Sequence, residues 1–209
     1  MNSKVTHINV GNLAENCWFL ANEDTKETVV IDPGAEPDRI CAAAEKHGWK
    51  ITAILLTHGH IDHMGACESL RTELGVKVYA LTEEEDLLLD AKKNLSVFIE
   101  RKVVTFEPDE LLCDGQELTL AGMKIQVIHT PGHTPGGCSY YVAEAGCVFS
   151  GDTLFAESVG RSDFPGGSTS ALVRAVKEKL FLLPDDTLVC PGHGEETTIG
   201  HEKKYNPFV

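Results

Sequence analysis

The sequence has few basic side chains and no long apolar run. Its 209 residues include 18 Lys and Arg against 32 Asp and Glu, which gives a formal net charge of −14 at pH 7. A surplus of acid without basic clusters argues against nucleic acid or an anionic membrane as the main partner. No segment approaches the roughly 18 consecutive apolar residues of a membrane span, and residues 1–10 lack the apolar centre of a signal peptide.

Cysteine pairs are also missing. The seven cysteines are an odd number and form no Cys-x-x-Cys motif, so they predict reduced thiols in a cytoplasmic protein. The hydrophobic fraction of 42% and the charged fraction of 24% are those of an ordinary globular chain. Because domains usually contain about 100–200 residues, we expect residues 1–209 to form a single domain.

Short apolar runs alternate with amphipathic segments along the chain. The pattern predicts strands over 17–21, 29–32, 51–57, 76–80, 117–120, 124–129, 139–143, 147–150 and 187–190. It predicts helices over 36–47, 63–74, 82–101 and 168–181, the last one capped by Ser168 or Thr169. This order favours an α/β fold of two packed sheets with helices on the outer faces. A single doubly wound sheet has the same periodicity and is the alternative.

The segment after the strand predicted at 51–57 carries the first group of chemically informative residues. It contains the motif His-x-His-x-Asp-His, formed by His58, His60, Asp62 and His63, where a buried strand passes into a helix. The two-residue spacing lets His58 and His60 point to one side, whereas Asp62 and His63 turn away in the first helical turn. Such donors suit two neighbouring metal ions better than one. Burying so much imidazole without a metal would be costly.

A Pro-Gly-His motif occurs twice, each time after a predicted strand. It ends at His133 and again at His193, so each histidine lies on a tight turn at a strand end. We prefer His133 to His129 as a ligand because His129 continues the packed face of its strand. Asp152 also follows a strand, and its carboxylate is suited to bridge two cations and offset their repulsion.

These residues predict a metal centre of five imidazoles and two carboxylates without thiolate. Such a donor set suits Zn²⁺, with two ions expected per chain, and Fe, Mn or Ni are alternatives.

The order and spacing of the donors resemble the metallo-β-lactamase superfamily over nearly the whole chain. Thr57 before the first histidine, the Asp-Pro-Gly turn that begins at Asp32, and the segment GDTLF over 151–155 all look like that family. The resemblance implies a metallo-β-lactamase αβ/βα sandwich of two mixed sheets, with the metals in a cleft at one edge. It also makes Asp32 and Thr57 candidates for orienting the imidazoles.

The resemblance further implies a division of the ligands between two metals. One metal would be held by His58, His60 and His133. The other would be held by Asp62, His63 and His193, with Asp152 bridging the two.

Two segments narrow the resemblance to one branch. The segments 151–155 and 158–167 are similar to glyoxalase II-like hydrolases (hydroxyacylglutathione hydrolase-like), in their short bacterial-type form without the C-terminal helical part, since only residues 194–209 follow His193. Asp152, where β-lactamases tend to carry Cys or Ser, favours this branch over antibiotic cleavage. His60, where flavo-diiron proteins carry Glu, argues against those proteins. Glu195 stands where the long form has a substrate-binding Tyr, so the resemblance does not imply this substrate contact for the present chain.

Arg161 is the one substrate-binding residue that the resemblance suggests. It falls where glyoxalase II carries a basic residue that meets glutathione, so we expect it to contact an anion; an internal ion pair with Asp163 is the alternative. For the helix predicted at 82–101 we expect packing on the core, with covering of the cleft as the alternative. Cys67 is expected to be a buried core thiol.

The resemblance implies a metal-dependent hydrolase that cleaves a thioester such as S-lactoylglutathione with a metal-bridging hydroxide. A water held between two cations has a pKa lowered toward about 7, and Asp62 would orient this nucleophile or accept its proton. The expected partner is a small-molecule thioester, with a glutathione conjugate as one form of it, and neither nucleic acid nor membrane.

Three alternatives remain open. One is a mononuclear iron sulfur dioxygenase that acts on a persulfide through His58, His133 and Asp152. A second is a lactone or phosphodiester hydrolase of the same fold. A metal-binding module without enzymatic activity would need a closed site, which the glycine-rich loops disfavour.

Overall fold

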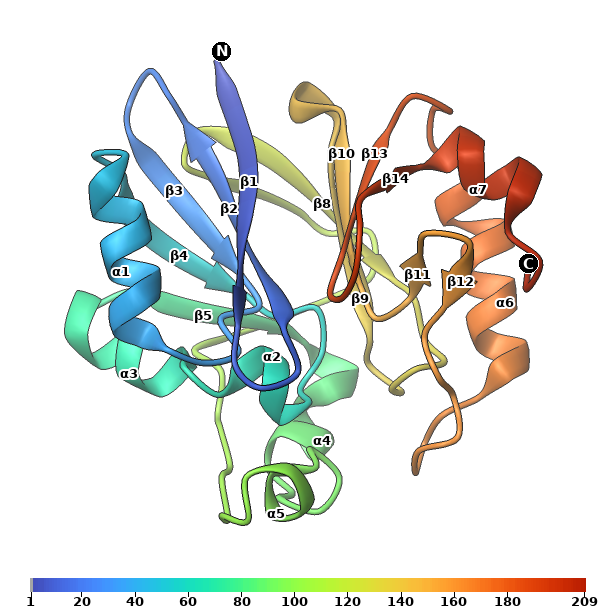
Figure 1. Cartoon of the computed structure of the whole chain (residues 1–209), viewed down its shortest axis with the longest axis horizontal. Coiled ribbons are helices and arrows are strands. Elements are labelled where there is room, and N and C mark those ends of the chain that lie inside the picture. Colours follow the sequence, from blue (N-terminus) through green and yellow to red (C-terminus); the bar gives the residue numbers. More distant parts are fainter. Residues whose placement is uncertain (1) are drawn as a thin grey trace.

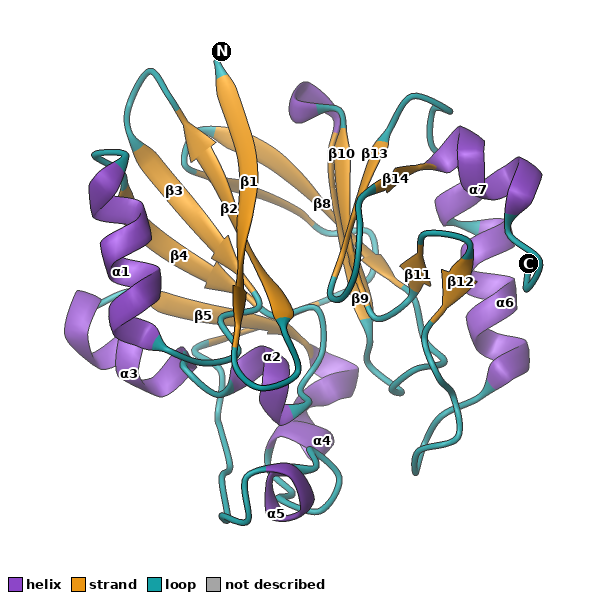
Figure 2. Ribbon diagram, in the orientation of Figure 1, coloured by secondary structure: helices purple, strands orange, loops and turns teal. Residues whose placement is uncertain are grey.

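Two six-stranded β-sheets lie face to face, and helices cover their outer faces (Figures 1 and 2). The computed structural model describes residues 2–209. The expected αβ/βα sandwich is therefore confirmed, and the single doubly wound sheet is wrong.

The first sheet is built from the N-terminal half of the chain and has the strand order β1-β2-β3-β4-β5-β6. Its strands are β1 (Ser3–Val10), β2 (Glu15–Asn22), β3 (Glu27–Ile31), β4 (Lys50–Leu55), β5 (Lys77–Leu81) and β6 (Glu110–Leu112). The pairs from β1 to β3 are antiparallel and those from β3 to β6 are parallel. Helices α1 (Pro37–Lys46) and α3 (Cys67–Leu74) lie on its outer face (Figure 1).

The second sheet has the order β14-β13-β10-β9-β8-β7. Its strands are β7 (Glu117–Leu120), β8 (Met123–His129), β9 (Cys138–Val142), β10 (Cys147–Gly151), β13 (Leu188–Pro191) and β14 (Thr197–Thr198). Only the β10–β13 pair of this sheet is parallel. Helices α6 (Thr169–Glu178) and α7 (Ile199–Tyr205) cover it, and a small ribbon of β11 (Leu154–Phe155) and β12 (Ser158–Val159) lies beside them (Figure 2).

Three apolar layers hold this arrangement together. Trp18, Val127 and Tyr140 belong to the layer between the two sheets. Ile40 of α1 packs in the layer outside the first sheet, and Val176 of α6 in the layer outside the second. Each fully buried side chain of this size contributes roughly 1.5–3 kcal/mol through removal of apolar surface from water. The strand ends that carry the polar motifs are thereby fixed.

The prediction of one continuous helix over 82–101 is wrong. The segment forms a 3₁₀ turn (Thr82–Glu84), α4 (Glu85–Leu88) and α5 (Ser96–Ile99), with a turn between the two helices. The side chain of Asp90 accepts a hydrogen bond from Lys92 N (2.9 Å), and Leu95 adopts a positive φ of 67°. The Asn94 side chain then donates to the carbonyl of Val104 (2.8 Å). Local side-chain bonds of this kind compete with the helix and end it.

The helix predicted over 63–74 is also divided. It begins earlier, as α2 (Ile61–Met64), and α3 follows after a break at Gly65. A Cβ atom at Gly65 would lie 2.3 Å from the carbonyl oxygen of Gly34, so the backbone packs closely at the break. Strand β1 was not predicted, because its polar and apolar residues lie on the edge of the sheet and are half exposed. The Ser168 cap is confirmed, since its side chain accepts a hydrogen bond from Ala171 N (3.3 Å).

Within residues 2–209, no helix has the length and apolar character needed to cross a membrane. The seven cysteines are all unpaired, and Cys67 is fully buried in α3.

Candidate metal centre

Four segments that follow strands meet at one edge of the sandwich. Residues 57–63 follow β4, residues 130–137 follow β8, Asp152 follows β10 and His193 follows β13. Strands β8, β10 and β13 run in one direction, because β8 and β10 are both antiparallel to β9 and β10 is parallel to β13. Their C-terminal ends therefore present these loops together on a rigid support.

Hydrogen bonds between the two sheets fix this edge. The Tyr140 hydroxyl of the second sheet donates to the carbonyl of Leu56, just before the first histidine (2.7 Å). In the other direction, Trp18 Nε1 and Asn16 Nδ2 of the first sheet donate to the carbonyl of Pro191 (2.9 and 3.0 Å). Each sheet thus holds a loop of the other, so the loops reach their relative positions only when the sheets are packed.

His58, His60 and His133 form a first group of donors. One ring nitrogen of each lies within 4.8 Å of those of the others, and His60 Nδ1 is 2.9 Å from His133 Nε2. His133 Nδ1 is 2.7 Å from the carbonyl oxygen of Arg161, which can only accept, so Nδ1 carries the proton. The lone pair on His133 Nε2 consequently faces the other two rings.

Asp62, His63 and His193 form a second group, again with donor atoms within 4.8 Å of one another. Asp62 Oδ2 lies 3.3 Å from His193 Nε2 and 3.8 Å from His63 Nε2. Asp152 lies between the groups, with Oδ1 3.5 Å from His63 Nε2 and Oδ2 3.6 Å from His133 Nε2. The structure thus brings all seven predicted ligands to one place.

Three buried donor atoms of this cluster lack a hydrogen-bond partner among the described residues, and this shows whether metal ions fit the site. His58 Nε2, His63 Nε2 and Asp152 Oδ1 are buried and have no hydrogen-bond partner within residues 2–209. Leaving a buried polar atom without a partner costs about 1–3 kcal/mol, so three of them facing one another would be unfavourable without a further ligand. Imidazole and carboxylate donors in two groups with a carboxylate between them fit two divalent cations.

The electrostatics of the site keep His58 and His60 neutral and Asp62 ionised. Burial holds the pKa of His58 well below its usual value and lowers the pKa of His60 to about 3, with the neighbouring histidines adding to the effect. Burial alone would raise the pKa of Asp62, but the imidazoles of His63 and His193 hold it below its usual range. These groups are therefore in the protonation states that metal binding requires near neutral pH.

Asp32 and Thr57 contact the ligands from behind. Asp32 Oδ2 accepts hydrogen bonds from the Thr57 hydroxyl (2.5 Å) and from His63 Nδ1 (3.0 Å), and Oδ1 accepts one from Thr57 N (2.7 Å). The Thr57 hydroxyl also lies 3.2 Å from His58 Nδ1. Burial would lower the pKa of His63, but the carboxylates of Asp152, Asp62 and Asp32 raise it. The hydrogen bond to Asp32 fixes the orientation of the His63 ring, so that Nε2 faces the cluster.

Glu84 is a buried residue that the sequence analysis did not identify. Its carboxylate accepts hydrogen bonds from Gly59 N (2.9 Å) and Gly136 N (2.8 Å), so it joins the loop of His58 and His60 to the loop of His133. Burial raises its pKa to about 7. The sequence signal is weak, because Glu83 and Glu85 flank Glu84 and only the packing selects which of the three is buried.

Glu15 is a second residue that was missed. It lies on β2 fully buried, with Oε1 3.9 Å from His63 Nδ1, and burial raises its pKa well above the usual value. A single Glu at the start of an apolar run carries no sequence signal for this position.

The glycines of the two Pro-Gly-His motifs have a steric role. A Cβ atom at Gly192 would lie 2.4 Å from Asp152 Oδ1 and 2.6 Å from His63 Cε1. At Gly132, where φ is 140°, it would lie 2.4 Å from the backbone nitrogen of Leu172 in α6. Any larger residue would displace a ligand at the first position and a helix at the second.

An open cavity of about 900 Å³ lies over the donors. Its wall includes Leu95, Phe98 and Ile99, so the part of the segment 82–101 around α5 lines the cleft, whereas Leu88 of α4 packs in the core as expected. Arg161 also lines the cavity, but its guanidinium makes two hydrogen bonds of 2.8 Å to the Asp163 carboxylate. The internal ion pair given as the alternative for Arg161 is thus present.

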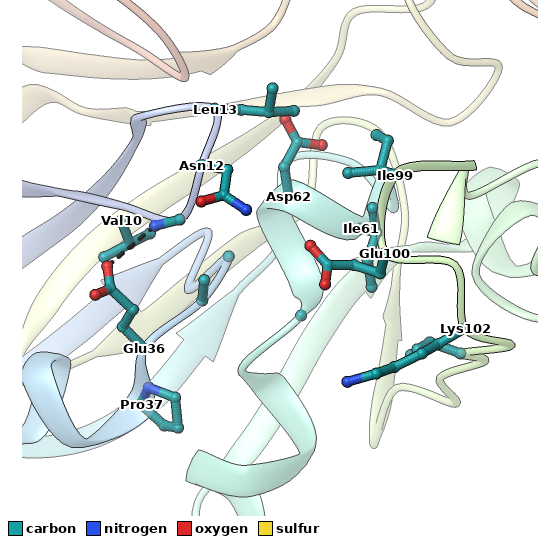
Figure 3. A pocket seen from close by; sticks show the side chains of 15 residues that line it. Val10, Asn12, Leu13, Glu36, Pro37, Ile61, Asp62, Ile99, Glu100 and Lys102 are labelled. Carbon is teal, nitrogen blue, oxygen red and sulfur yellow. Dashed lines mark hydrogen bonds between the residues drawn. The ribbon is translucent and has the colours of Figure 1, made fainter. Parts of the chain in front are cut away.

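A smaller cavity of about 260 Å³ lies on the other side of Leu13, Asp62 and Ile99 (Figure 3). Figure 3 shows Glu36 at its far wall, where the carboxylate accepts a hydrogen bond from Gly11 N (3.1 Å). These three residues line both cavities, so Asp62 borders a cavity on each of two sides. His129 Nε2 bonds instead to the carbonyl of Pro135 (2.8 Å), and Cys67 is a buried thiol of α3, as expected.

Comparison with known proteins agrees with this geometry. Residues 10–193 match the family described as the metallo-beta-lactamase superfamily. The chain is 39% identical to a probable metallo-hydrolase, YqgX of Bacillus subtilis, over 96% of this chain and 94% of that protein. It is 36% identical to the hydroxyacylglutathione hydrolase GloC of Haemophilus influenzae, over 93% of this chain and 92% of that protein.

Solved structures with the same architecture include three informative neighbours. The BLEG-1 B3 metallo-beta-lactamase superposes with a TM-score of 0.93 at 38% identity, covering 98% of this chain and 99% of that one. A di-iron-bound form of TTHA1623 has a TM-score of 0.86 at 38% identity, covering 98% and 100%. ETHE1 from Myxococcus xanthus has a TM-score of 0.77 at 29% identity, covering 99% and 84%.

Proposed function

Because this chain belongs to the metallo-beta-lactamase superfamily, we propose that it is a metal-dependent hydrolase of small thioesters. The observation that carries the proposal is the convergence of seven imidazole and carboxylate donors at the floor of an open cavity. The similarity to GloC supports a thioester as the substrate class, with S-lactoylglutathione as a first candidate.

The residues of the cluster have distinct tasks in this reaction. In our proposal His58, His60 and His133 hold one cation, Asp62, His63 and His193 hold the other, and Asp152 contacts both. Bound divalent cations supply an acidified water as nucleophile and polarise the substrate carbonyl. Zn²⁺ is the proposed metal, and the di-iron form of TTHA1623 supports iron as the first alternative, with manganese after it.

Asp62 has the additional role of a proton acceptor. Its carboxylate is held ionised by His63 and His193 and faces both the donor space and the cavity. It can therefore orient a water molecule or accept its proton while remaining a ligand. A thiol leaving group has a pKa of roughly 8.5 and departs without a dedicated acid, which agrees with the absence of a free acidic side chain elsewhere on the cavity wall within residues 2–209.

The unpaired state of all seven cysteines supports a reducing, cytoplasmic setting as part of the proposal. We propose no nucleic-acid or membrane partner, in keeping with the charge of −14.

The test is metal analysis combined with a substrate panel. Protein loaded with Zn²⁺, Fe²⁺ or Mn²⁺ is analysed for metal content and assayed for thiol release from S-lactoylglutathione and simpler thioesters. We expect two metals per chain and a fall of at least about 100-fold in kcat/KM for Asp152→Ala. Asp186→Ala, at an exposed carboxylate far from the site, is the control. Full turnover and full metal content in Asp152→Ala would refute the proposal.

Two other reactions are included in the panel because specific observations favour them. The similarity to BLEG-1 favours hydrolysis of a β-lactam amide, which a chromogenic cephalosporin detects. The donors His58, His133 and Asp152, together with iron in TTHA1623, favour a persulfide dioxygenase. One iron per chain with persulfide-dependent oxygen uptake would replace the hydrolase proposal. A lactone and a phosphodiester complete the panel.

A further inference from the structure

The cavity over the donors has an apolar wall that runs from the donors toward solvent. Several of its large side chains are exposed, with Phe98 68% exposed, Leu13 49% and Ile99 38%. Large apolar residues gathered around one opening mark a ligand-binding site more often than a free surface. The apolar wall is formed by Leu13, Leu95, Phe98, Ile99, Phe155 and Phe164.

This wall begins directly at the metal donors. The Phe164 ring meets the ring of His60 edge-on, with centroids 5.3 Å apart, and Phe155 meets His193 in the same way at 6.5 Å. A substrate whose scissile carbonyl lies at the donors therefore has an apolar surface immediately next to that carbonyl. From there Phe98 and Ile99 of α5 extend the wall toward solvent.

The cavity has two cationic side chains, and they differ in availability. Arg161 is neutralised by the Asp163 carboxylate, and its guanidinium lies 4.0 Å from the centroid of the Phe164 ring. Lys92 is exposed at the mouth and forms no ion pair within residues 2–209. Lys92 is thus the ammonium that can receive an anionic group from a ligand.

We propose that the substrate is amphipathic, with an apolar acyl chain packed against Phe98, Ile99 and Phe164 and one carboxylate paired with Lys92. The inference rests on the proposed thioester hydrolysis and narrows its substrate class. It makes thioesters with an acyl chain of about six to eight carbons better substrates than the short, polar lactoyl thioester. The reason is that the cavity volume of about 900 Å³ is in the range of sites for drug-sized ligands.

The first experiment compares two matched series of thioesters on the zinc-loaded protein. Acetyl, butyryl, hexanoyl and octanoyl thioesters of N-acetylcysteamine vary only the apolar chain. The same acyl groups on N-acetylcysteine add one carboxylate. We expect kcat/KM to rise about twofold to fourfold per added methylene, since burial of one methylene contributes at most about 0.8 kcal/mol. We expect the N-acetylcysteine series to be cleaved several-fold faster than its neutral counterpart.

Two pairs of variants assign these effects to residues. Phe98→Ala should remove most of the dependence on chain length, whereas Leu182→Ala, at an equally exposed residue away from the cavity, should not. Lys92→Gln should remove the preference for N-acetylcysteine thioesters over N-acetylcysteamine thioesters, measured as the ratio of the two kcat/KM values in the same variant. Lys93→Gln changes the exposed neighbour that does not line the cavity and is the control.

A binding measurement without turnover separates this inference from the proposed function. Acetate and octanoate are titrated calorimetrically into the zinc-loaded protein and into the Phe98→Ala and Lys92→Gln variants. One outcome is that no thioester is cleaved, octanoate binds at least about tenfold tighter than acetate, and Phe98→Ala abolishes this difference. That outcome supports the amphipathic binding site and shows that the proposed thioester hydrolysis is wrong. If thioesters are cleaved at rates independent of chain length, or octanoate binds no tighter than acetate, the inference is wrong.

Discussion

At the scale of single residues, Asp32 illustrates how one carboxylate positions several groups. It adopts a positive φ of 54°, a conformation that Asp tolerates better than most residues, at the turn after β3. This turn directs the carboxylate to the Thr57 backbone and hydroxyl and to His63 Nδ1. From the sequence, only the family resemblance marked Asp32 as a residue that orients the imidazoles, because residues 32 and 63 are far apart in the chain.

The first prediction concerns this contact. In Asp32→Asn an NH₂ group replaces one of the two accepting oxygens, so either His63 or Thr57 loses its acceptor. We expect the affinity for one metal ion to fall about 10-fold to 100-fold, as for other groups that orient metal ligands. Competition with a chelating dye measures this loss, and Asp186→Asn is the control. Unchanged metal affinity in Asp32→Asn would contradict the assigned role.

The second prediction concerns Glu84 and pH. Its pKa is raised from 4.5 to about 7 in the folded protein, so between these values the folded state binds more protons than the unfolded state. The free energy of unfolding therefore decreases as pH rises through this window, by about 3 kcal/mol for this group.

Chemical denaturation of the wild type and of Glu84→Gln, both in the same metal state, checks this dependence. The stability of the wild type relative to the variant should fall from pH 4.5 to pH 7, because the amide does not ionise. Glu83→Gln, at the exposed neighbour, should show no such trend relative to the wild type. A difference between wild type and Glu84→Gln that is constant with pH would mean that the Glu84 carboxyl keeps its ordinary pKa.

At the scale of elements, helices end or begin where a side chain offers the backbone a better partner. Ser168 and Thr198 accept hydrogen bonds from the backbone of the first turns of α6 and α7 (3.3 and 3.2 Å). In the segment 82–101 Asp90 and Asn94 do the opposite and interrupt an otherwise apolar and helical pattern. The same residue types thus start one helix and stop another, and only their contacts distinguish the two cases.

The third prediction follows from the two helix caps. Ser168→Ala and Thr198→Ala should each lower the free energy of unfolding by about 1 kcal/mol. The metal content and kcat/KM should stay the same, because neither side chain belongs to the donor cluster. Denaturation curves and metal analysis check both statements, with Lys177→Ala, at an exposed position of α6, as the control. A loss of metal in either cap variant would show that these helices also position the site.

At the scale of the whole molecule, the metal centre joins the two sheets. Its donors come from loops after β4, β8, β10 and β13, which belong to both sheets. A metal that binds the folded protein more tightly than the unfolded chain stabilises it, by about 2.7 kcal/mol when the free metal is at 100 times its Kd.

The fourth prediction is that chelation lowers the melting temperature and that added Zn²⁺ restores it. Scanning calorimetry before chelation, after chelation and after addition of metal measures the change. In Asp152→Ala the drop on chelation should be much smaller, because this variant lacks the carboxylate between the two groups. An equal drop in both proteins would mean that the stabilising metal binds elsewhere.

The sequence by itself predicted the seven donors and, through the family resemblance, the fold class. The His-x-His-x-Asp-His motif and the repeated Pro-Gly-His motif are local patterns at strand ends, and the directions of the strands bring such ends to one edge. The alternation of strands and helices left a two-sheet sandwich and a single doubly wound sheet open, and the family resemblance carried by the motifs selected the sandwich.

Only the tertiary structure decided the surroundings of these donors. The burial of Glu84 rather than Glu83 and the apolar wall around Phe98 depend on contacts between segments distant in the chain. Local periodicity predicts that a residue lies on a helix or strand, but not which distant residue packs against it. That packing determines which carboxylate is buried, which cation is free and what the cavity can hold.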